Sequence, residues 1–150
     1  MSAGSPLYLD TSCLLKLFLL EPDSPAVVEV LSEESHVVVS ELARLEAETQ
    51  LRARLVGGRL TKSRHRRIAA ELARILSSEP FVVTVFPREA YDGARKLAEK
   101  AKVHCRTLDL LHLAAMSAGG IERLFTSDHK QCKAARSLGL SVTMPRELEE

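Results

Sequence analysis

The chain has 150 residues, of which 45% are hydrophobic and 27% charged, and its formal net charge at pH 7 is only +1. This composition is typical of a globular protein and excludes a disordered or fibrous chain, and no apolar run is long enough to cross a membrane. The length suits one domain with its own core, so we expect a single domain over residues 1–150.

The first half of the chain alternates short apolar runs with segments of helical spacing. The expected elements are strands at 6–9 and 36–39 and helices beginning near Thr11, near Ser24 and at Glu41, the last ending near Leu55. Ser24, followed by Pro25, is placed to cap the second helix, and Val27, Val28 and Leu31 would face the core. Ser40 is the expected cap of the third helix.

The second half continues the same alternation after Gly57-Gly58, which breaks the chain. The expected elements are strands at 81–85, 124–126 and 141–144 and helices at 61–77, 87–102, 108–118 and 129–138. Thr107 is the expected cap of helix 108–118, and Gly139 ends the last helix. Apolar strands separated by helices predict a three-layer α/β/α sandwich around a parallel sheet of about five strands.

The N-terminus and the cysteines indicate a cytoplasmic protein. Met1 to Leu9 lacks both a basic leader and the apolar core of a signal peptide. The cysteines are Cys13, Cys105 and Cys132. Because they are odd in number, scattered and without a CxxC pair, they predict reduced thiols rather than a disulfide framework or a thiolate zinc site.

Two carboxylates are expected at one edge of the sheet. Asp10 ends the first strand, and Asp128 follows the strand at 124–126. In an open parallel sheet the carboxyl ends of the strands face the ligand. Either acid alone is equally well explained as a helix cap, so their shared edge is what suggests a site.

Two further acids come from helices. A turn of about 100° per residue places Glu46 in the apolar stripe of its helix, between Leu42, Thr49 and Ala53, where an uncompensated carboxylate is costly. Asp109 lies in the first turn of a helix that is apolar around nearly its whole circumference, and the helix dipole also favours an acid there. Both acids are therefore expected on the buried side of their helices.

Four acids that meet at one edge would raise one another's pKa values, and a divalent cation would remove this repulsion. Oxygen ligands favour Mg²⁺ or Mn²⁺ over Zn²⁺. Such a cation orients a phosphodiester and lowers the pKa of a bound water. The predicted reaction is metal-dependent hydrolysis of a nucleic acid.

Four motifs resemble, in order, those of PIN domains of the VapC toxin type. They are Leu7-Tyr8-Leu9-Asp10-Thr11-Ser12 with Glu21-Pro22, Ser40-Glu41-Leu42-Ala43-Arg44-Leu45-Glu46, Arg106-Thr107-Leu108-Asp109-Leu110-Leu111-His112-Leu113-Ala114, and Thr126-Ser127-Asp128 with residues 134–140. Together they span essentially the whole chain. One departure is Leu110, where many relatives have Ala, and it leaves every acid in place.

The resemblance implies a five-stranded parallel sheet, endoribonuclease activity and Mg²⁺ or Mn²⁺ as cofactor. It implies that three acids hold the metal directly or through water: Asp10, Asp109 and Asp128. Glu46 would complete the catalytic set and help position the attacking water, with Ser12 and Thr126 as supporting hydroxyls. VapC-like proteins usually form homodimers and are neutralised by a small antitoxin that covers the acidic site, so RNA, an antitoxin and a second copy are the expected partners.

Two of these residues, the basic stretch and the function itself each have an alternative interpretation. Ser12 also suits a cap of the first helix, and His112 is better explained as a packed core histidine than as a catalytic base. Residues 51–70 contain seven Lys or Arg and no acid. This basic stretch is a solvated helix face, an RNA contact through Arg64 and Arg67, or a docking surface for an antitoxin or second subunit. The alternative function is a PIN-like module that binds RNA or a partner without cleaving.

Overall fold

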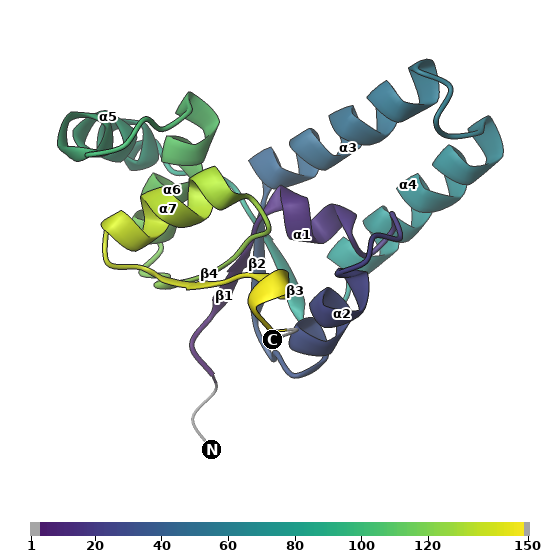
Figure 1. Ribbon diagram of the computed structural model, residues 1–150, viewed down its shortest axis with the longest axis horizontal. Helices are drawn as coiled ribbons and strands as arrows, with labels where there is room; N and C mark the ends of the chain where they lie inside the picture. Colours follow the sequence, from purple (N-terminus) through teal and green to yellow (C-terminus); the bar gives the residue numbers. More distant parts are fainter. Residues whose placement is uncertain (1–3, 149–150) are drawn as a thin grey trace.

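The computed structural model describes residues 4–148 and shows a parallel sheet with helices on both faces (Figure 1). The strands are β1 (Leu7–Leu9), β2 (Val37–Ser40), β3 (Phe81–Thr84), β4 (Arg123–Phe125) and β5 (Ser141–Thr143). Their order in the sheet is β3-β2-β1-β4-β5, and every neighbouring pair is parallel. The predicted α/β sandwich with five parallel strands is confirmed.

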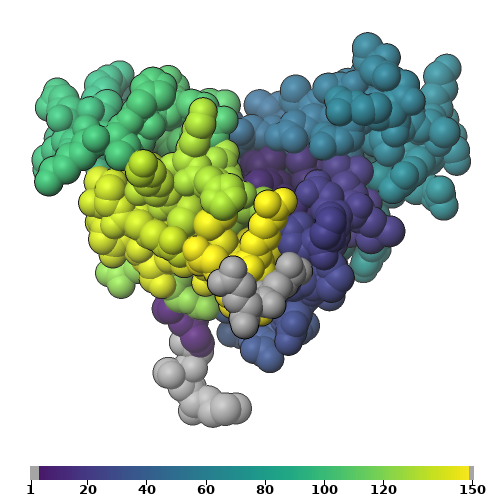
Figure 2. All heavy atoms as spheres, in the orientation of Figure 1, coloured from purple at the N-terminus to yellow at the C-terminus, as the bar shows by residue number. Residues whose placement is uncertain are grey.

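The helices divide between the two faces of the sheet and two projecting arms. They are α1 (Thr11–Leu15), α2 (Ser24–Ser32), α3 (Glu41–Val56), α4 (Lys62–Leu76), α5 (Glu89–Lys100), α6 (Thr107–Ala118) and α7 (His129–Ser137), followed by a 3₁₀ turn, η1 (Pro145–Leu148). Helix α5 packs on α6, and α3 and α4 form a long hairpin (Figure 1). In the space-filling view these two arms rise on either side of a notch (Figure 2).

The central strand β1 explains why both faces must be covered. Leu7 and Leu9 point into a core built with α1, α2, α3 and α4, whereas Tyr8 points into a second core beneath α6 and α7. Successive strand side chains alternate between faces, and all three residues are at most 1% exposed. Because side chains alternate along β1, only Tyr8 of its three residues faces α6.

One of the predicted helix caps is correct and two are wrong. The hydroxyl of Ser40 accepts from a backbone N–H group of α3, as predicted, whereas Thr61, expected as the first residue of its helix, is the cap of α4. Ser24 is instead inside α2, because its hydroxyl accepts from Glu21 N and donates to the carbonyl of Leu19 in the preceding turn. Thr107 is likewise the first residue of α6, and the cap position belongs to Arg106.

The structure also tests other local expectations, and one of them is wrong. Val28, expected in the core, is 53% exposed, because α2 buries Ala26, Val27 and Leu31 instead. Strand β3 is only half-buried, since it lies at the edge of the sheet. The three cysteines are free thiols, as expected. No helix within residues 4–148 combines the length and apolarity needed to cross a membrane.

Candidate active site

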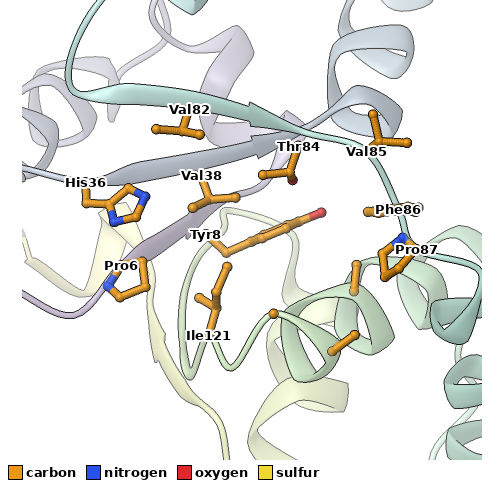
Figure 3. Close-up of a pocket in the computed structure, with 13 residues that line it drawn as sticks. Pro6, Tyr8, His36, Val38, Val82, Thr84, Val85, Phe86, Pro87 and Ile121 are labelled. Atoms are coloured by element: carbon orange, nitrogen blue, oxygen red, sulfur yellow. The ribbon is translucent and has the colours of Figure 1, made fainter.

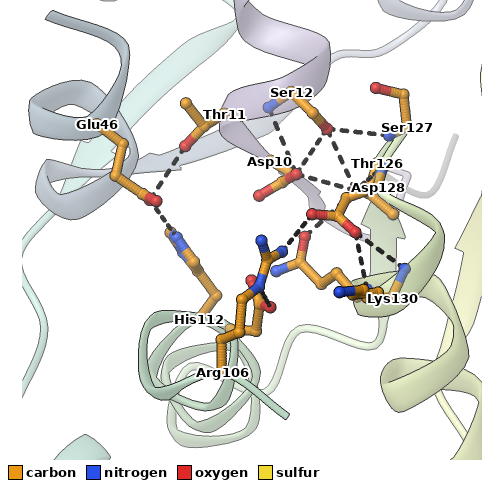
Figure 4. Close-up of polar contacts among 12 residues, drawn as sticks. Asp10, Thr11, Ser12, Glu46, Arg106, His112, Thr126, Ser127, Asp128 and Lys130 are labelled. Atoms are coloured by element: carbon orange, nitrogen blue, oxygen red, sulfur yellow. Dashed lines mark hydrogen bonds and ion pairs between the residues drawn. The ribbon is translucent and has the colours of Figure 1, made fainter. Parts of the chain in front are cut away.

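The four predicted acids line one pocket of about 290 Å³. Asp10 directly follows β1, Asp128 lies between β4 and α7, and the remaining two acids come from α3 and α6. The pocket therefore lies at the carboxyl ends of two adjacent strands, β1 and β4, where an open α/β sheet binds its ligand. Figure 4 shows that its polar side chains form two hydrogen-bonded groups, one around Asp10 and Asp128 and one around Glu46.

Asp10 is the most buried of these carboxylates, at 6% exposed. It occupies the N-cap of α1 and accepts hydrogen bonds from Ser12 Oγ at 2.6 Å and Thr126 Oγ1 at 2.9 Å. The nitrogen of the Gln131 amide faces Asp10 and donates to Oδ1 at 2.9 Å, since the reverse orientation would oppose two oxygens. Burial raises the pKa of the Asp10 carboxyl above its usual range despite these donors.

The two predicted supporting hydroxyls connect Asp10 to the loop after β4. Ser12 Oγ donates to Asp10 and accepts from Ser127 N at 3.0 Å. Thr126 Oγ1 donates to Asp10 and accepts from Asp128 N at 3.0 Å. Because Asp10 is itself the cap of α1, the hydroxyl of Ser12 is not used as a helix cap.

Arg106 forms ion pairs with two of the four carboxylates of the pocket. Its Nε donates to Asp109 Oδ2 at 2.7 Å, and its Nη2 pairs with Asp128 Oδ2. Partial burial raises the pKa of Asp128, but hydrogen bonds from Arg106 and from the backbone N–H groups of Lys130 and Gln131 outweigh it and hold that pKa below its usual range. Asp128 is thus an ionised cap of α7 with one guanidinium beside it.

The Arg106 pairing predicts acid sensitivity. The folded pKa of Asp128 lies below its unfolded value of about 3.9, so its carboxylate stabilises the fold above that value and loses this contribution as pH falls through the folded pKa. Arg106→Gln should remove about 1 kcal/mol of this contribution at neutral pH. Urea unfolding at pH 7 and pH 3 measures it. The control is Arg95→Gln, which breaks an exposed pair with Asp92; an identical pH dependence in both variants contradicts the assignment.

Glu46 lies at the border of the buried stripe of α3 rather than at its centre. The stripe consists of Ala43, Ala47 and Leu51, and the Glu46 side chain is 24% exposed. The buried face of α3 is therefore rotated from the predicted one, since Thr49, which was expected in the apolar stripe, is exposed. Compensation of the carboxylate is nevertheless present: Oε1 of Glu46 accepts from Thr11 Oγ1 at 3.1 Å and contacts His112 Nε2 at 2.6 Å.

Four residues of this site were not singled out from the sequence: Arg106, Gln131 and, as partners of Glu46, Thr11 and His112. His112 is buried and hydrogen-bonded, which confirms the prediction of a packed histidine. Its position three residues after Asp109 was visible in the sequence, but its partner on α3 was not. Arg106, three residues before Asp109, carried a comparable signal as an opposite charge one turn away.

Arg64 and Arg67 lie on α4, outside the lining of the acidic pocket. With Leu17 and Phe18 they line a separate shallow hollow of about 310 Å³. Within residues 4–148 neither arginine forms an ion pair. Their charge is therefore available to a ligand or partner.

Another hollow, of about 400 Å³, opens between β3 and α6 (Figure 3). Its walls are mainly apolar and include Val38, Val82 and Phe86 but no carboxylate. Its titratable side chains are His36 and Tyr8, which come without a carboxylate beside them, whereas the acidic pocket brings four carboxylates together and is therefore the candidate active site.

The donors of the acidic pocket fit a hard divalent cation by their chemistry. The four carboxylates and the neighbouring hydroxyls offer oxygen alone, which suits Mg²⁺ or Mn²⁺. Among the residues that the structure describes, no three His, Cys, Asp or Glu side chains are grouped closely enough to hold an ion in this conformation. Arg106, which bridges Asp109 and Asp128, supplies positive charge there.

The PIN domain family matches residues 7–137, so the chain belongs to the PIN-domain family. The chain is 33% identical over 141 residues to Ribonuclease VapC46 of Mycobacterium tuberculosis (strain ATCC 25618 / H37Rv). This alignment covers 93% of this chain and 97% of that protein. The predicted relationship to VapC-type ribonuclease toxins is confirmed.

Solved structures agree on the fold. FitAcB from Neisseria gonorrhoeae superposes with a TM-score of 0.72 at 20% identity, over 93% of this chain and 98% of that chain. A toxin-antitoxin complex from Klebsiella pneumoniae superposes with a TM-score of 0.64 at 16% identity, over 93% and 97% of the two chains. At these identities the likeness establishes a shared fold.

Proposed function

We propose that this chain is a metal-dependent endoribonuclease, formed by one nuclease domain, that acts in the cytoplasm as the toxin of a toxin–antitoxin pair. The observation that carries the proposal is the convergence of four carboxylates, from four separate segments, on one pocket at the carboxyl edge of the sheet. Its relative VapC46 is a ribonuclease, which supports RNA as the substrate.

Each residue of the pocket has a distinct task in this proposal. A divalent cation held by Asp10, Asp109 and Asp128, directly or through water, would polarise the phosphodiester and lower the pKa of a water. Ser12 and Thr126 keep Asp10 in place through the hydrogen bonds described above. The remaining acid, from α3, orients the attacking water, since it lies partly exposed in the pocket wall.

The alternative is a PIN-like module that binds without cleaving. It would be expected to lack one of the acids, and here all four line the pocket. The purified protein, incubated with tRNA, rRNA fragments and mRNA in the presence of Mg²⁺ or Mn²⁺, should cut at least one of them. Binding without cleavage under all these conditions would favour the silent module.

An antitoxin and a second copy of the chain are the proposed protein partners. The toxin-antitoxin complex from Klebsiella pneumoniae has the same fold and supports the first. The second rests on the usual homodimeric state of VapC-like proteins. Size-exclusion chromatography with light scattering would report the mass of the isolated protein, and a monomer at micromolar concentration would contradict the homodimer.

Charge reversal on α4 tests whether the basic stretch grips RNA. Arg64→Glu with Arg67→Glu should weaken RNA binding roughly 10-fold or more and lower the salt slope by about one per phosphate contact. Filter binding of one RNA at several salt concentrations measures both quantities. The matched control reverses Arg95 and Lys96 on α5. Equal effects of the two reversals would mean that only net charge matters, and no effect of the α4 reversal would assign this face to protein partners.

A further inference from the structure

A buried tyrosine–histidine pair stands behind Glu46. The hydroxyl of Tyr8, on β1, contacts His112 Nδ1 at 2.6 Å, and His112 Nε2, on α6, contacts Glu46 Oε1 at 2.6 Å. Tyr8 and His112 are each 1% exposed. Both nitrogens of the imidazole are thus used by side chains, and one of those side chains lines the acidic pocket.

The surroundings of the ring determine its orientation. The rings of Tyr8 and Phe86 meet the imidazole edge-on, with centroid distances of 5.8 and 5.9 Å. The Tyr8 ring lies in the wall of the apolar hollow of Figure 3 while its hydroxyl reaches inward to His112. The imidazole is therefore held by packing as well as by hydrogen bonds, and it cannot rotate without breaking both.

The chemistry of the three groups assigns the protons. An ionised carboxylate only accepts, so His112 Nε2 carries the proton and donates to Glu46. In the tautomer that carries its proton on Nε2, Nδ1 has a free lone pair and accepts from the Tyr8 hydroxyl. The chain of donors therefore runs from Tyr8 through His112 to Glu46.

This chain of donors leaves one oxygen of Glu46 unused. Thr11 Oγ1 and His112 Nε2 both donate to Oε1. Within residues 4–148 no hydrogen bond to Oε2 is present. A carboxylate clamped through one oxygen presents the other in a fixed direction to a water or cation in the pocket.

We propose that His112, itself held by Tyr8, is a positioning residue that fixes the Glu46 carboxylate so that Oε2 orients the attacking water. The inference rests on the proposed nuclease function and deepens it. A histidine that served only to fill the core would not need a donor aimed at a partly exposed carboxylate on another helix. The role is exerted through Glu46, since His112 is not among the residues that line the acidic pocket.

Two substitutions at position 112 separate positioning from packing. His112→Leu keeps the volume approximately but removes the donor, and kcat for RNA cleavage should fall by 10- to 100-fold with KM nearly unchanged. His112→Gln places an amide nitrogen close to the position of Nε2 and should restore kcat to within a few-fold of wild type. Equal kcat values for the Gln and Leu variants would overturn the proposal.

A double-mutant comparison adds a readout that a purely structural role would not move. If His112 acts through Glu46, then His112→Leu has little further effect on single-turnover cleavage once Glu46→Ala is present. The same fold-loss in both backgrounds would overturn the proposal. Should His112→Leu fail to fold by circular dichroism, Tyr8→Phe takes its place, because it keeps the ring and removes the hydroxyl; its expected loss is a few-fold.

Nuclear magnetic resonance tests the contact without any activity. The spectrum of the metal-free protein should contain one slowly exchanging imidazole Nε2–H resonance that disappears in His112→Gln. Glu46→Ala should shift this resonance and speed its exchange, and an unshifted resonance would overturn the proposal. A wild-type protein that cuts no RNA but shows the shift would refute the proposed function and leave the His112–Glu46 contact standing.

Discussion

Asp10→Asn is expected to abolish RNA cleavage, by on the order of 10³-fold or more, while the metal-free protein becomes more stable. The loss follows because asparagine keeps the shape of Asp10 but removes the negative charge proposed to hold the cation. The gain in stability follows from burial, which raises the pKa of Asp10 in the folded state. Such an acid begins to oppose folding as pH rises through its unfolded pKa of about 3.9, and the cost is complete above the raised folded pKa, so a neutral asparagine relieves that cost at pH 7.

The gain in stability is limited, because hydrogen bonds from neighbouring donors already stabilise the ionised Asp10 carboxylate. Ser12, Thr126 and Gln131 all donate to Asp10, so we expect a net gain of about 1 kcal/mol, or 2–4 °C in Tm for a chain of this length. Thermal unfolding in EDTA and a cleavage assay in Mn²⁺ measure the two effects. Asp92→Asn, on the exposed face of α5, is the matched control and should change neither.

Two outcomes would contradict this prediction. Full cleavage by Asp10→Asn would refute the assignment of the site. A loss of cleavage that coincides with a large fall in Tm would show only that asparagine breaks the cap of α1, and the charge would then have to be tested through Asp109→Asn, which is not a cap.

Metal removal is expected to have the second large effect. EDTA should reduce cleavage to background, and addition of Mg²⁺ or Mn²⁺ should restore it, because oxygen ligands alone favour these ions over Zn²⁺. The cation should also stabilise the fold, by about 2.7 kcal/mol at a concentration of 100 times its Kd. It does so by neutralising carboxylates, including one whose pKa burial raises. Cleavage with and without EDTA, and Tm as a function of metal concentration, are the measurements.

The same variants serve as controls for the metal. Asp10→Asn should lose most of the metal-dependent rise in Tm, whereas Asp92→Asn should keep it. Undiminished cleavage in EDTA would exclude a metal-dependent mechanism. A rise in Tm that is equal in Asp10→Asn would place the cation elsewhere on the protein.

Much of the fold was predictable because its signals are local. The β-branched run ending at Ser40, the glycine pair at 57–58 and the acids after β1 and β4 each depend on a few neighbouring residues, and the corresponding elements appear within two or three residues of their expected bounds. Predictions were wrong where a side chain that suits a local role forms its hydrogen bonds elsewhere. Ser24 is the clearest case, since its hydroxyl is used by a turn and not by the helix that follows.

The sequence by itself determined the class of the fold, the four acids and their order along the chain, because apolar periodicity and strand ends are written in short segments. Only the tertiary structure decided what each acid contacts. Arg106, at the N-cap of α6, bridges Asp109 of the same helix to Asp128, which follows β4, and His112 joins Glu46 to Tyr8 across three elements. These contacts depend on how α3 and α6 are placed around β1. That placement is set by packing between residues distant in the chain, which no local pattern records.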